Sequence, residues 1–352
     1  AIRYGKDHKK LSDGSIPTYG SGGIMRYVDT AICEQPSVLI PRKGTLGNLF
    51  YTDEPFWTVD TLFWTDIDQT KIVPKYLYYQ LKQKDLASYN VGTAVPSLTV
   101  EVLNEIDLDV PSIDKQRRIV EVLNSFDSKI ALNNQLNDYL EQLVDGKFQE
   151  LFGGLNFNAT LSDVAEITMG QSPAGSSYNE EGAGIIFYQG RGEFGWRFPK
   201  RRLYTTEPKR LACEGDVLMS VRAPVGDLNV AFENCCIGRG LAAIHSETPS
   251  FALYLMRFLK PQLEAYNGEG TVFGSINGKA LKSLEVALPS HNEVMQFESF
   301  AAPIDALIRS NENETRKLNN LRNYLLPKLM SGEIDVSKVD LTQLTNNHLV
   351  DC

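Results

Sequence analysis

The stretch Gly92-Thr93-Ala94-Val95-Pro96-Ser97-Leu98 returns 178 positions later as Gly270-Thr271-Val272-Phe273-Gly274-Ser275-Ile276. The same register persists without a gap as far as Leu143, which matches Leu321. A single offset held over so long a stretch indicates an internal duplication rather than coincidence. The chain is therefore predicted to contain two copies of one structural unit.

Each copy has the same internal order. A mixed region rich in Gly, Pro and aromatic residues comes first, with runs typical of β-strands at Ser37–Ile40, Ile185–Tyr188 and Asp216–Val221. A helical stretch follows, at Pro74–Leu86 in one copy and Ser250–Tyr266 in the other. A long helix closes each copy. This order of strands and helices predicts an α/β (α+β) fold in tandem repeat.

The first copy opens later in the pattern than the second. The second opens at Leu161, whereas the chain begins near the equivalent of Thr168, at Arg3-Tyr4-Gly5. About ten residues, including one short strand, therefore have no match in the first copy. Two explanations stay open: the chain is truncated, or the strand comes from elsewhere.

Two long helices are predicted from apolar residues that recur at steps of three and four. The first follows Pro111-Ser112, runs to about Phe152 and stops at Gly153-Gly154. The second begins at Ser290, where Ser-x-x-Glu fits a capping box, and Pro327 is expected to bend or end it.

The two helices are predicted to pack against each other along a polar-interrupted seam. The seam residues are Leu123, Phe126, Ile130, Asn133, Leu140, Ile304, Ile308, Asn311 and Leu318. Asn133 and Asn311 occupy matched positions, and a buried Asn between helices fixes their register. The alternative is two amphipathic helices, each packed on its own domain. A helix of about 35 residues is about 50 Å long, or about 15 base pairs of B-DNA, and could act as a ruler.

Composition narrows the class of protein. The 352 residues are 42% hydrophobic and 22% charged, and no apolar run reaches the roughly 18 residues of a membrane span. The cysteines are Cys33, Cys213, Cys235, Cys236 and Cys352. They show neither zinc spacing nor a disulfide framework, so a reducing cytoplasm, no metal and no cofactor are expected.

The net charge of −9 is unusual for a protein that grips DNA phosphates. No large segment is basic as a whole. One window, 191–210, has seven basic and two acidic side chains and is locally +5. A basic stripe is therefore predicted there, and partner proteins are expected to complete the grip on DNA.

Over essentially its full length the chain resembles specificity subunits of type I restriction–modification systems. The resemblance is carried by Leu161–Pro173, by Gly215-Asp216-Val217-Leu218-Met219-Ser220-Val221-Arg222-Ala223-Pro224-Val225-Gly226-Asp227, by Pro111-Ser112 with Gln116, Ile119, Asp127 and Asn133, and by Leu325–Ile334. The second helix departs from the first, with Val294 and Phe297 in place of Gln116 and Ile119.

The resemblance implies two target-recognition domains separated by two conserved helices that form an antiparallel coiled coil. Each domain would read one half of a split, asymmetric sequence in double-stranded DNA. The helices would set the spacing and dock two modification (methyltransferase) subunits, and restriction (motor nuclease) subunits would join the full complex. No catalytic site is expected. The expected segments are the first domain at 1–110, the first helix at 111–154, the second domain at 155–289, the second helix at 290–332 and a tail at 333–352.

DNA contacts are expected from loops that offer cations, hydroxyls or glycines to base edges and phosphates. The candidates in the first domain are Tyr19, Ser21, Gly22, Arg42, Lys43 and Thr45. Those in the second domain are Arg191, Arg197, Lys200, Arg201, Arg202 and Arg222. For each basic residue the alternative is a solvated surface charge.

The sequence disfavours two other functions. A DNA methyltransferase or nuclease fused to a recognition domain would need catalytic motifs, such as an (N/D)PP(Y/F) tetrapeptide, and these are missing. The match of Gly190–Gly195 to G-x-G-x-x-G does not predict a dinucleotide site, because Trp196-Arg197-Phe198-Pro199 follows in place of a helix. A pure coiled-coil scaffold would not need two large, diverged globular repeats.

Overall fold

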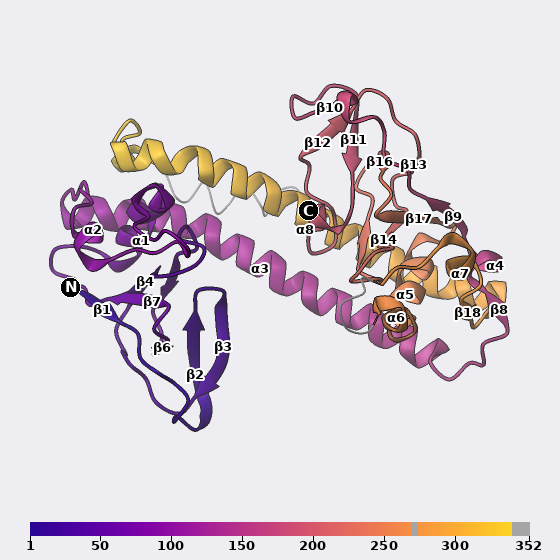
Figure 1. Ribbon diagram of the computed structural model, residues 1–352, viewed down its shortest axis with the longest axis horizontal. Coiled ribbons are helices and arrows are strands. Elements are labelled where there is room, and N and C mark those ends of the chain that lie inside the picture. Colours follow the sequence, from indigo (N-terminus) through magenta and orange to yellow (C-terminus); the bar gives the residue numbers. More distant parts are fainter. Residues whose placement is uncertain (269–273, 340–352) are drawn as a thin grey trace. The chain divides into compact units, whose positions relative to one another are not determined.

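The computed structural model describes residues 1–268 and 274–339, and it divides into two compact units. Unit 1 comprises Ala1–Leu132 and the part of the chain from Glu314 onward, and unit 2 comprises Asn133–Asn313. Two long helices, α3 (Ile113–Phe152) and α8 (His291–Ser331), each contribute one half to each unit (Figure 1). Four residues of the duplicated motif, Gly270-Thr271-Val272-Phe273, lie outside the described residues.

Unit 1 contains a four-stranded antiparallel sheet in the order β1-β7-β4-β5 and a three-stranded sheet in the order β3-β2-β6. The strands are β1 (Ile2–Tyr4), β2 (Asp13–Gly20), β3 (Gly23–Val28), β4 (Ser37–Pro41), β5 (Phe50–Thr52), β6 (Trp57–Thr58) and β7 (Leu62–Thr65). The helices are α1 (Pro74–Lys82) and α2 (Val100–Asn104), with 3₁₀ turns η1 (Leu86–Tyr89) and η5 (Val336–Lys338). All five residues of β4 are buried, as a central strand covered on both faces requires.

Unit 2 contains three sheets, in the orders β15-β14-β17-β9, β10-β12-β11-β16-β13 and β18-β8. The strands are β8 (Ala159–Thr160), β9 (Glu166–Met169), β10 (Tyr178–Asn179), β11 (Ile185–Tyr188), β12 (Leu203–Thr205), β13 (Leu211–Ala212), β14 (Val217–Ser220), β15 (Leu228–Val230), β16 (Cys235–Ile237), β17 (Leu241–His245) and β18 (Glu285–Val286). The helices are α4 (Leu161–Val164), α5 (Pro249–Phe258), α6 (Lys260–Glu264) and α7 (Gly278–Lys282), with 3₁₀ turns η2 (Gly175–Ser177), η3 (Arg191–Glu193) and η4 (Ala265–Asn267).

The two units repeat one topology, which confirms the duplication and the mixed fold class. The order β1-β7-β4-β5 in unit 1 matches β9-β17-β14-β15 in unit 2. Each unit also has one parallel strand pair at the same place, β2 with β6 and β11 with β16. The strands predicted at Ser37–Ile40, Ile185–Tyr188 and Asp216–Val221 are β4, β11 and β14.

The units differ where the first copy was expected to be short. In unit 2, β8 pairs with β18, and Leu161 of the following turn is 1% exposed in the core. Within the described residues of unit 1 no strand or helix corresponds to β8 and α4. The matching edge, at Asp107-Leu108, instead borders a hollow of about 310 Å³ lined largely by apolar side chains. Leu108, Leu103 and Ile2 are among the residues that line this hollow.

In unit 1 the first half of α3 packs on the second half of α8. Leu123 and Phe126 of α3 share one buried cluster with Leu318 and Leu329 of α8. Arg322 of α8 donates to the Asp127 carboxylate at 2.7 Å, and the Tyr79 hydroxyl of α1 donates to the other oxygen of the same carboxylate at 2.5 Å. The helix pair and the globular part of unit 1 are therefore bound together by apolar and polar contacts.

In unit 2 the second half of α3 packs on the first half of α8, so the two helices run antiparallel. Val144 and Phe148 of α3 share a core with Phe297 and Ala301 of α8. The Phe297 ring lies 5.3 Å, between centroids, from that of Phe148. These contacts confirm that the two helices pack on each other.

Two seam asparagines are buried in unit 2. Asn133 is 2% and Asn311 is 8% exposed. Asn311 Nδ2 donates to Asn137 Oδ1 at 2.8 Å, and Asn133 Nδ2 donates to the Asn311 carbonyl at 3.5 Å. Such polar contacts in an apolar seam disfavour any register that would separate them.

At the start of α8 one prediction is confirmed, and near its end one of the two outcomes predicted for Pro327 is excluded. Ser290 and Glu293 form the predicted capping box, because the Ser290 amide and hydroxyl donate to Glu293 Oε2 at 2.8 and 2.7 Å. Pro327 does not end the helix, which continues to Ser331. A proline inside a helix lacks an amide donor and its ring crowds the carbonyl four residues earlier, but buried Leu326, Leu329 and Met330 hold the last turns in place.

Candidate nucleic-acid interface

One pair of loops is built identically in the two units. In unit 1 the Leu98 amide donates to the Arg42 carbonyl at 3.0 Å, and the Gly44 amide donates to the Pro96 carbonyl at 3.0 Å. In unit 2 the Ile276 amide donates to the Val221 carbonyl and the Ala223 amide to the Gly274 carbonyl, both at 3.0 Å. Matched backbone hydrogen bonds to the duplicated glycine motif thus hold the loop that follows β4 or β14.

Each of these loops presents an exposed cation at the matched position. Lys43 forms an isolated bridge with Ser97, and Arg222 forms the same bridge with Ser275. Ser97 and Ser275 therefore have one structural role in both copies, as the duplicated motif predicts. The side chains of Lys43 and Arg222 are exposed. Because the backbone holds the loop, the cation is free to serve a ligand.

In unit 1 the neighbouring hollow, of about 730 Å³, is lined by glycines, two hydroxyl-bearing residues, two apolar residues and four polar or charged ones. It is bordered by Asp7, His8, Lys9, Gly20, Ser21, Gly22, Met25, Val59, Asp60 and Thr61. Gly22 has open space where a side chain would project. Asn48 Nδ2 donates to the Ser21 carbonyl at 2.8 Å, so the turn between β2 and β3 is tied to the loop after β4.

Three other candidates in unit 1 lie around this hollow. Arg42 is half-buried: it donates to the Asp60 carbonyl at 3.0 Å and its guanidinium lies 5.5 Å from the centre of the Tyr4 ring. Tyr19 is half-buried next to Phe50, and this burial raises the pKa of its hydroxyl. Thr45 is exposed on the loop after β4.

In unit 2 the matched hollow, of about 360 Å³, is bordered by arginines. Its lining is Gln189, Gly190, Arg191, Gly192, Glu193, Ser220, Arg222, Ala223, Arg239 and Gly240. Arg191 Nε pairs with Asp227 at 2.8 Å, which ties the loop after β11 to the β14–β15 hairpin just as Asn48 ties Ser21. The same scaffold therefore presents two hydroxyl groups and side chains of both charges in unit 1, but three arginines and one glutamate in unit 2.

Arg201 and Arg202, also in the window 191–210, are exposed, and each pairs with a carboxylate. Arg201 pairs with Glu233 at 2.6 Å, and Arg202 pairs with Glu193 at 2.7 Å. The hydrogen bond and charge of Glu193 raise the pKa of Arg202 above its ordinary value. Lys200 is also exposed. These pairs are solvent-screened and weak, so a DNA phosphate can compete with them.

The sequence predicted that Arg197 contacts DNA, but the structure buries its side chain, so it cannot contact DNA in this fold. Its side chain is 4% exposed and lies 3.0 Å from both Glu141 of α3 and Asp305 of α8. It also donates to the Tyr254 hydroxyl at 3.3 Å. Burial alone would lower the pKa of this guanidinium, but Tyr254, Asp305 and Glu141 raise it. Arg197 is a tie between the loop before β12 and both long helices.

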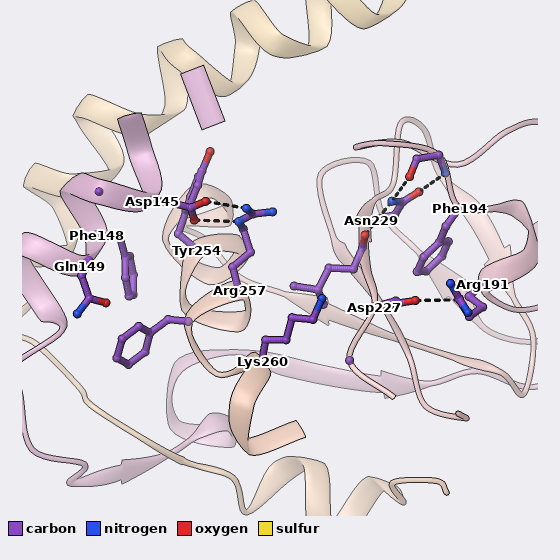
Figure 2. A pocket seen from close by; sticks show the side chains of 15 residues that line it. Asp145, Phe148, Gln149, Arg191, Phe194, Asp227, Asn229, Tyr254, Arg257 and Lys260 are labelled. Atoms are coloured by element: carbon purple, nitrogen blue, oxygen red, sulfur yellow. Dashed lines mark hydrogen bonds and ion pairs between the residues drawn. The ribbon is translucent and has the colours of Figure 1, made fainter. Parts of the chain in front are cut away.

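A second cavity of unit 2, of about 720 Å³, is also lined by Arg191 (Figure 2). Figure 2 shows Arg257 facing Asp145 of α3, with Lys260 below them and the Arg191–Asp227 pair on the opposite wall. Arg257 is 2.6 Å from Asp145 and 2.8 Å from Glu141. Asn229 Oδ1 accepts the Gly195 amide at 3.0 Å and fixes the loop after η3.

Sequence reasoning missed Arg239, Arg257 and Lys260. Arg239 lies two residues before β17, and the duplicated register places Asp60 two residues before β7 in unit 1. That alignment could have shown that the two copies differ in charge here, with Arg239 in one and Asp60 in the other. Arg257 lies in the last turn of helix α5 and Lys260 begins α6, where a periodic apolar pattern gives no sign of the cavity beside it.

None of the helices in residues 1–268 and 274–339 has both the length and the apolar character of a membrane span.

The comparisons with known proteins agree along the chain. The model of the type I restriction modification DNA specificity domain matches residues 3–142 and again residues 158–323. A candidate type I restriction enzyme specificity subunit, MjaX of Methanocaldococcus jannaschii, is 34% identical over 298 residues, which span 76% of this chain and 70% of that protein. The type I restriction enzyme MjaIX specificity subunit of the same organism is 23% identical over 348 residues, which span 86% of this chain and 78% of that protein.

A solved structure shares the fold. The crystal structure of a type I restriction–modification system S subunit from M. genitalium matches with a TM-score of 0.63. Its sequence is 16% identical, and the match covers 94% of this chain and 93% of that one. The chain therefore belongs to the type I restriction–modification DNA specificity family. Within such a system it is the specificity subunit, the component that recognises DNA and carries no catalytic activity.

Proposed function

We propose that each unit reads one half of a split, asymmetric DNA target through its matched hollow. The observation that carries this proposal is the contrast at one site: identical backbone bonds hold the loops after β4 and β14, whereas the exposed side chains around them differ. A shared scaffold with different side chains is what recognition of two unlike half-sites requires. Specificity resides in side chains that reach base edges, and the backbone only positions them.

The arginines of unit 2 suit guanine edges and phosphates, because a guanidinium can donate two parallel bonds to guanine O6 and N7. Ser21 and Thr45 of unit 1 can donate or accept and suit other bases. Arg197 is left out of the proposed DNA contacts because it is buried, and Arg239 is added, so each unit offers six residues. They are Tyr19, Ser21, Gly22, Arg42, Lys43, Thr45, Arg191, Lys200, Arg201, Arg202, Arg222 and Arg239.

We propose further that α3 and α8 set the distance between the two half-sites. Each helix contributes to both units, and the buried asparagine contacts of the seam hold one register. The segments 1–110, 111–154, 155–289, 290–332 and 333–352 then act as first reader, first helix, second reader, second helix and tail. The end of the tail lies outside the described residues.

Two modification subunits are proposed to dock on the long helices, in the cytoplasm, with restriction subunits joining the assembled complex. In unit 2, α3 exposes three large apolar side chains at helical spacing: Leu136 is 39%, Tyr139 is 59% and Leu143 is 54% exposed. Apolar residues at i, i+3 and i+7 form one stripe on a helix. Such a stripe offers the kind of surface that a partner helix covers.

Methylome sequencing of a host that expresses this chain with its modification subunit tests the proposed function. We expect one methylated motif with two unlike halves around an unread spacer. Replacing the first copy by a second copy of unit 2's reader, residues 155–289, is expected to give a symmetric motif built from one half. A single continuous motif in place of a split one would contradict the proposal.

Lengthening both helices by one turn is expected to lengthen the unread spacer. One helical turn is about 5.4 Å, which corresponds to between one and two base pairs at about 3.4 Å each. We expect the methylated motif of this variant to keep both halves and to gain one or two spacer base pairs. A variant lengthened in α3 alone is the control and should lose methylation, because the seam residues fall out of register. An unchanged spacer in the double variant would rule out the ruler.

Replacing Arg201 and Arg202 by alanine is expected to weaken DNA binding by the assembled methyltransferase about equally for all sequences. Both side chains are exposed and suit phosphates, and each lost phosphate contact reduces the salt dependence of log K by about one. The measurement is the affinity across a series of salt concentrations. Lys282→Ala on α7 is a matched control that should leave the slope unchanged. An unchanged slope in the double variant would remove this stripe from the interface.

A further inference from the structure

Three side chains with metal-binding atoms meet at one edge of unit 2, outside the proposed reading site. They are Cys213, Asp216 and His245, and their ligand atoms all lie within 4.8 Å of one another. We propose that these three residues form a binding site for a zinc-type divalent cation. Spacing in the sequence does not predict it, because Cys213 and Asp216 are separated from His245 by the whole of β14, β15, β16 and β17.

The strands fix the positions of the three residues. Asp216 directly precedes β14 and His245 ends β17, and these strands are paired with Val217 opposite Ile244. Cys213 follows β13 at the start of a tight turn, in which the Asp216 amide donates to the Cys213 carbonyl at 3.1 Å. Gly215 supports this turn with a φ of 90°, which other residues rarely adopt. The backbone thus brings the ligands together before any ion binds.

The site is anchored on one side and open on the other. Asp216 is 6% exposed, and its Oδ2 already accepts the Cys213 amide at 2.7 Å. His245 has a side chain that is 53% exposed, and Cys213 is exposed as well. An ion can therefore reach the thiolate and the imidazole from solvent, while the carboxylate is held still beneath it.

A hydrogen bond between His245 and Asp216 now occupies the place proposed for the ion. His245 Nδ1 lies 2.6 Å from Asp216 Oδ1, and this hydrogen bond raises the pKa of His245, as do the charges of Glu166 and Glu247. A divalent cation would displace the protons of His245 and of the Cys213 thiol and would neutralise the same carboxylate. Glu166, opposite His245 in the strand register, adds negative charge nearby.

The set of donor atoms selects the type of ion. Sulfur, imidazole nitrogen and one carboxylate oxygen suit zinc, with bond lengths of about 2.0–2.3 Å and a fourth position left for water. Calcium and magnesium require several oxygen ligands and are disfavoured by a thiolate.

The fold itself does not require these three side chains. The matched positions in unit 1 are Glu34, Ser37 and Asp66. There Ser37 Oγ donates to the Thr65 carbonyl at 2.8 Å and closes the same strand pair with a short hydrogen bond. Unit 1 shows that neither a cysteine nor a histidine is needed to build this edge, so their meeting with Asp216 in unit 2 calls for a separate explanation.

Titration of the reduced, full-length chain with Co²⁺, a spectroscopic substitute for zinc, tests the site. We expect tetrahedral cobalt absorption together with a thiolate-to-cobalt charge-transfer band. Cys213→Ser should abolish the charge-transfer band, and His245→Gln should weaken Co²⁺ and Zn²⁺ binding by roughly ten-fold or more. Cys33→Ser, in unit 1, is the matched control and should leave the spectrum unchanged.

Zinc should also raise the melting temperature of the wild-type chain and of Cys33→Ser, but not of Cys213→Ser, since an ion that binds only the folded state stabilises it. Circular dichroism of each variant without metal establishes that it is folded. Absence of the charge-transfer band in the wild type would overturn the proposal. A band that persists in Cys213→Ser would also overturn it, because another thiol would then be the ligand.

Discussion

Replacing Arg197 by methionine is expected to lower the free energy of unfolding of unit 2 by about 3–5 kcal/mol. The guanidinium is 4% exposed and is the shared partner of Glu141 and Asp305, which are 18% and 20% exposed. Removing it takes this charge from both carboxylates where little water can solvate them, and leaves Arg257 beside Glu141 and the Tyr254 hydroxyl beside Asp305. Asp305 Oδ2 has no hydrogen-bond partner among the described residues even with Arg197 in place. The loss should therefore exceed that of an ordinary surface pair.

Hydrogen exchange measured by mass spectrometry reports this loss locally. Peptides around β12, α5 and the unit 2 half of α8 should exchange faster, while peptides from β4 and β7 of unit 1 act as an internal reference. Arg201→Ala is the matched control: it removes an exposed ion pair from the same loop and should cost no more than about 1 kcal/mol. Adding Asp305→Asn to the Arg197 variant should restore part of the stability. If Arg197→Met were as stable as Arg201→Ala, the buried network would not be what ties this loop to the helices.

Reversing two charges in the unit 2 hollow, with Arg222→Glu and Arg239→Glu, should weaken binding of the target duplex by on the order of 100-fold or more. Each good side-chain contact with a base contributes about 1–3 kcal/mol, and 1.4 kcal/mol is a factor of ten. Both side chains are exposed and border one hollow, and the loop that carries Arg222 is held by backbone bonds. The fold should therefore survive the substitution, so that the loss belongs to the interface.

The measurement is binding of the assembled methyltransferase to duplexes in which one half-site at a time is altered. The wild type should lose affinity when either half is altered. The unit 2 variant should no longer distinguish the half that unit 2 reads and should still distinguish the other. Lys43→Glu, at the matched position of unit 1, should show the opposite pattern. Equal loss of discrimination at both halves in either variant would argue against one reader per half-site.

Local signals in the sequence predicted most of the fold. The duplicated register gave the two copies, and the apolar periodicity gave both long helices. Ser290 and Glu293 predicted the start of α8 because a capping box is closed within four residues. Of the two outcomes predicted for Pro327, a bend or an end of the helix, the end does not occur, since the prediction left out the buried contacts of the last turns.

The site was predicted less well, because its contacts join residues that are far apart in the sequence. Arg197 lies in a basic window and resembles its neighbours, but its partners Glu141 and Asp305 lie on helices that only tertiary structure brings together. The same holds for Cys213 and His245, which strand pairing places side by side. Arg239 was within reach, since alignment of the two copies places it opposite Asp60.

The backbone attachment of Lys43 and Arg222 has a consequence for how new recognition can arise. The backbone bonds that attach these loops do not use the side chains of Lys43 and Arg222, so substitutions at these exposed positions cost little folding free energy. Variation can therefore accumulate there while the protein stays folded. Because both copies use one attachment, exchange of a whole copy between related genes would also preserve it. Diversity of targets then needs no new architecture, only new surface chemistry on an inherited frame.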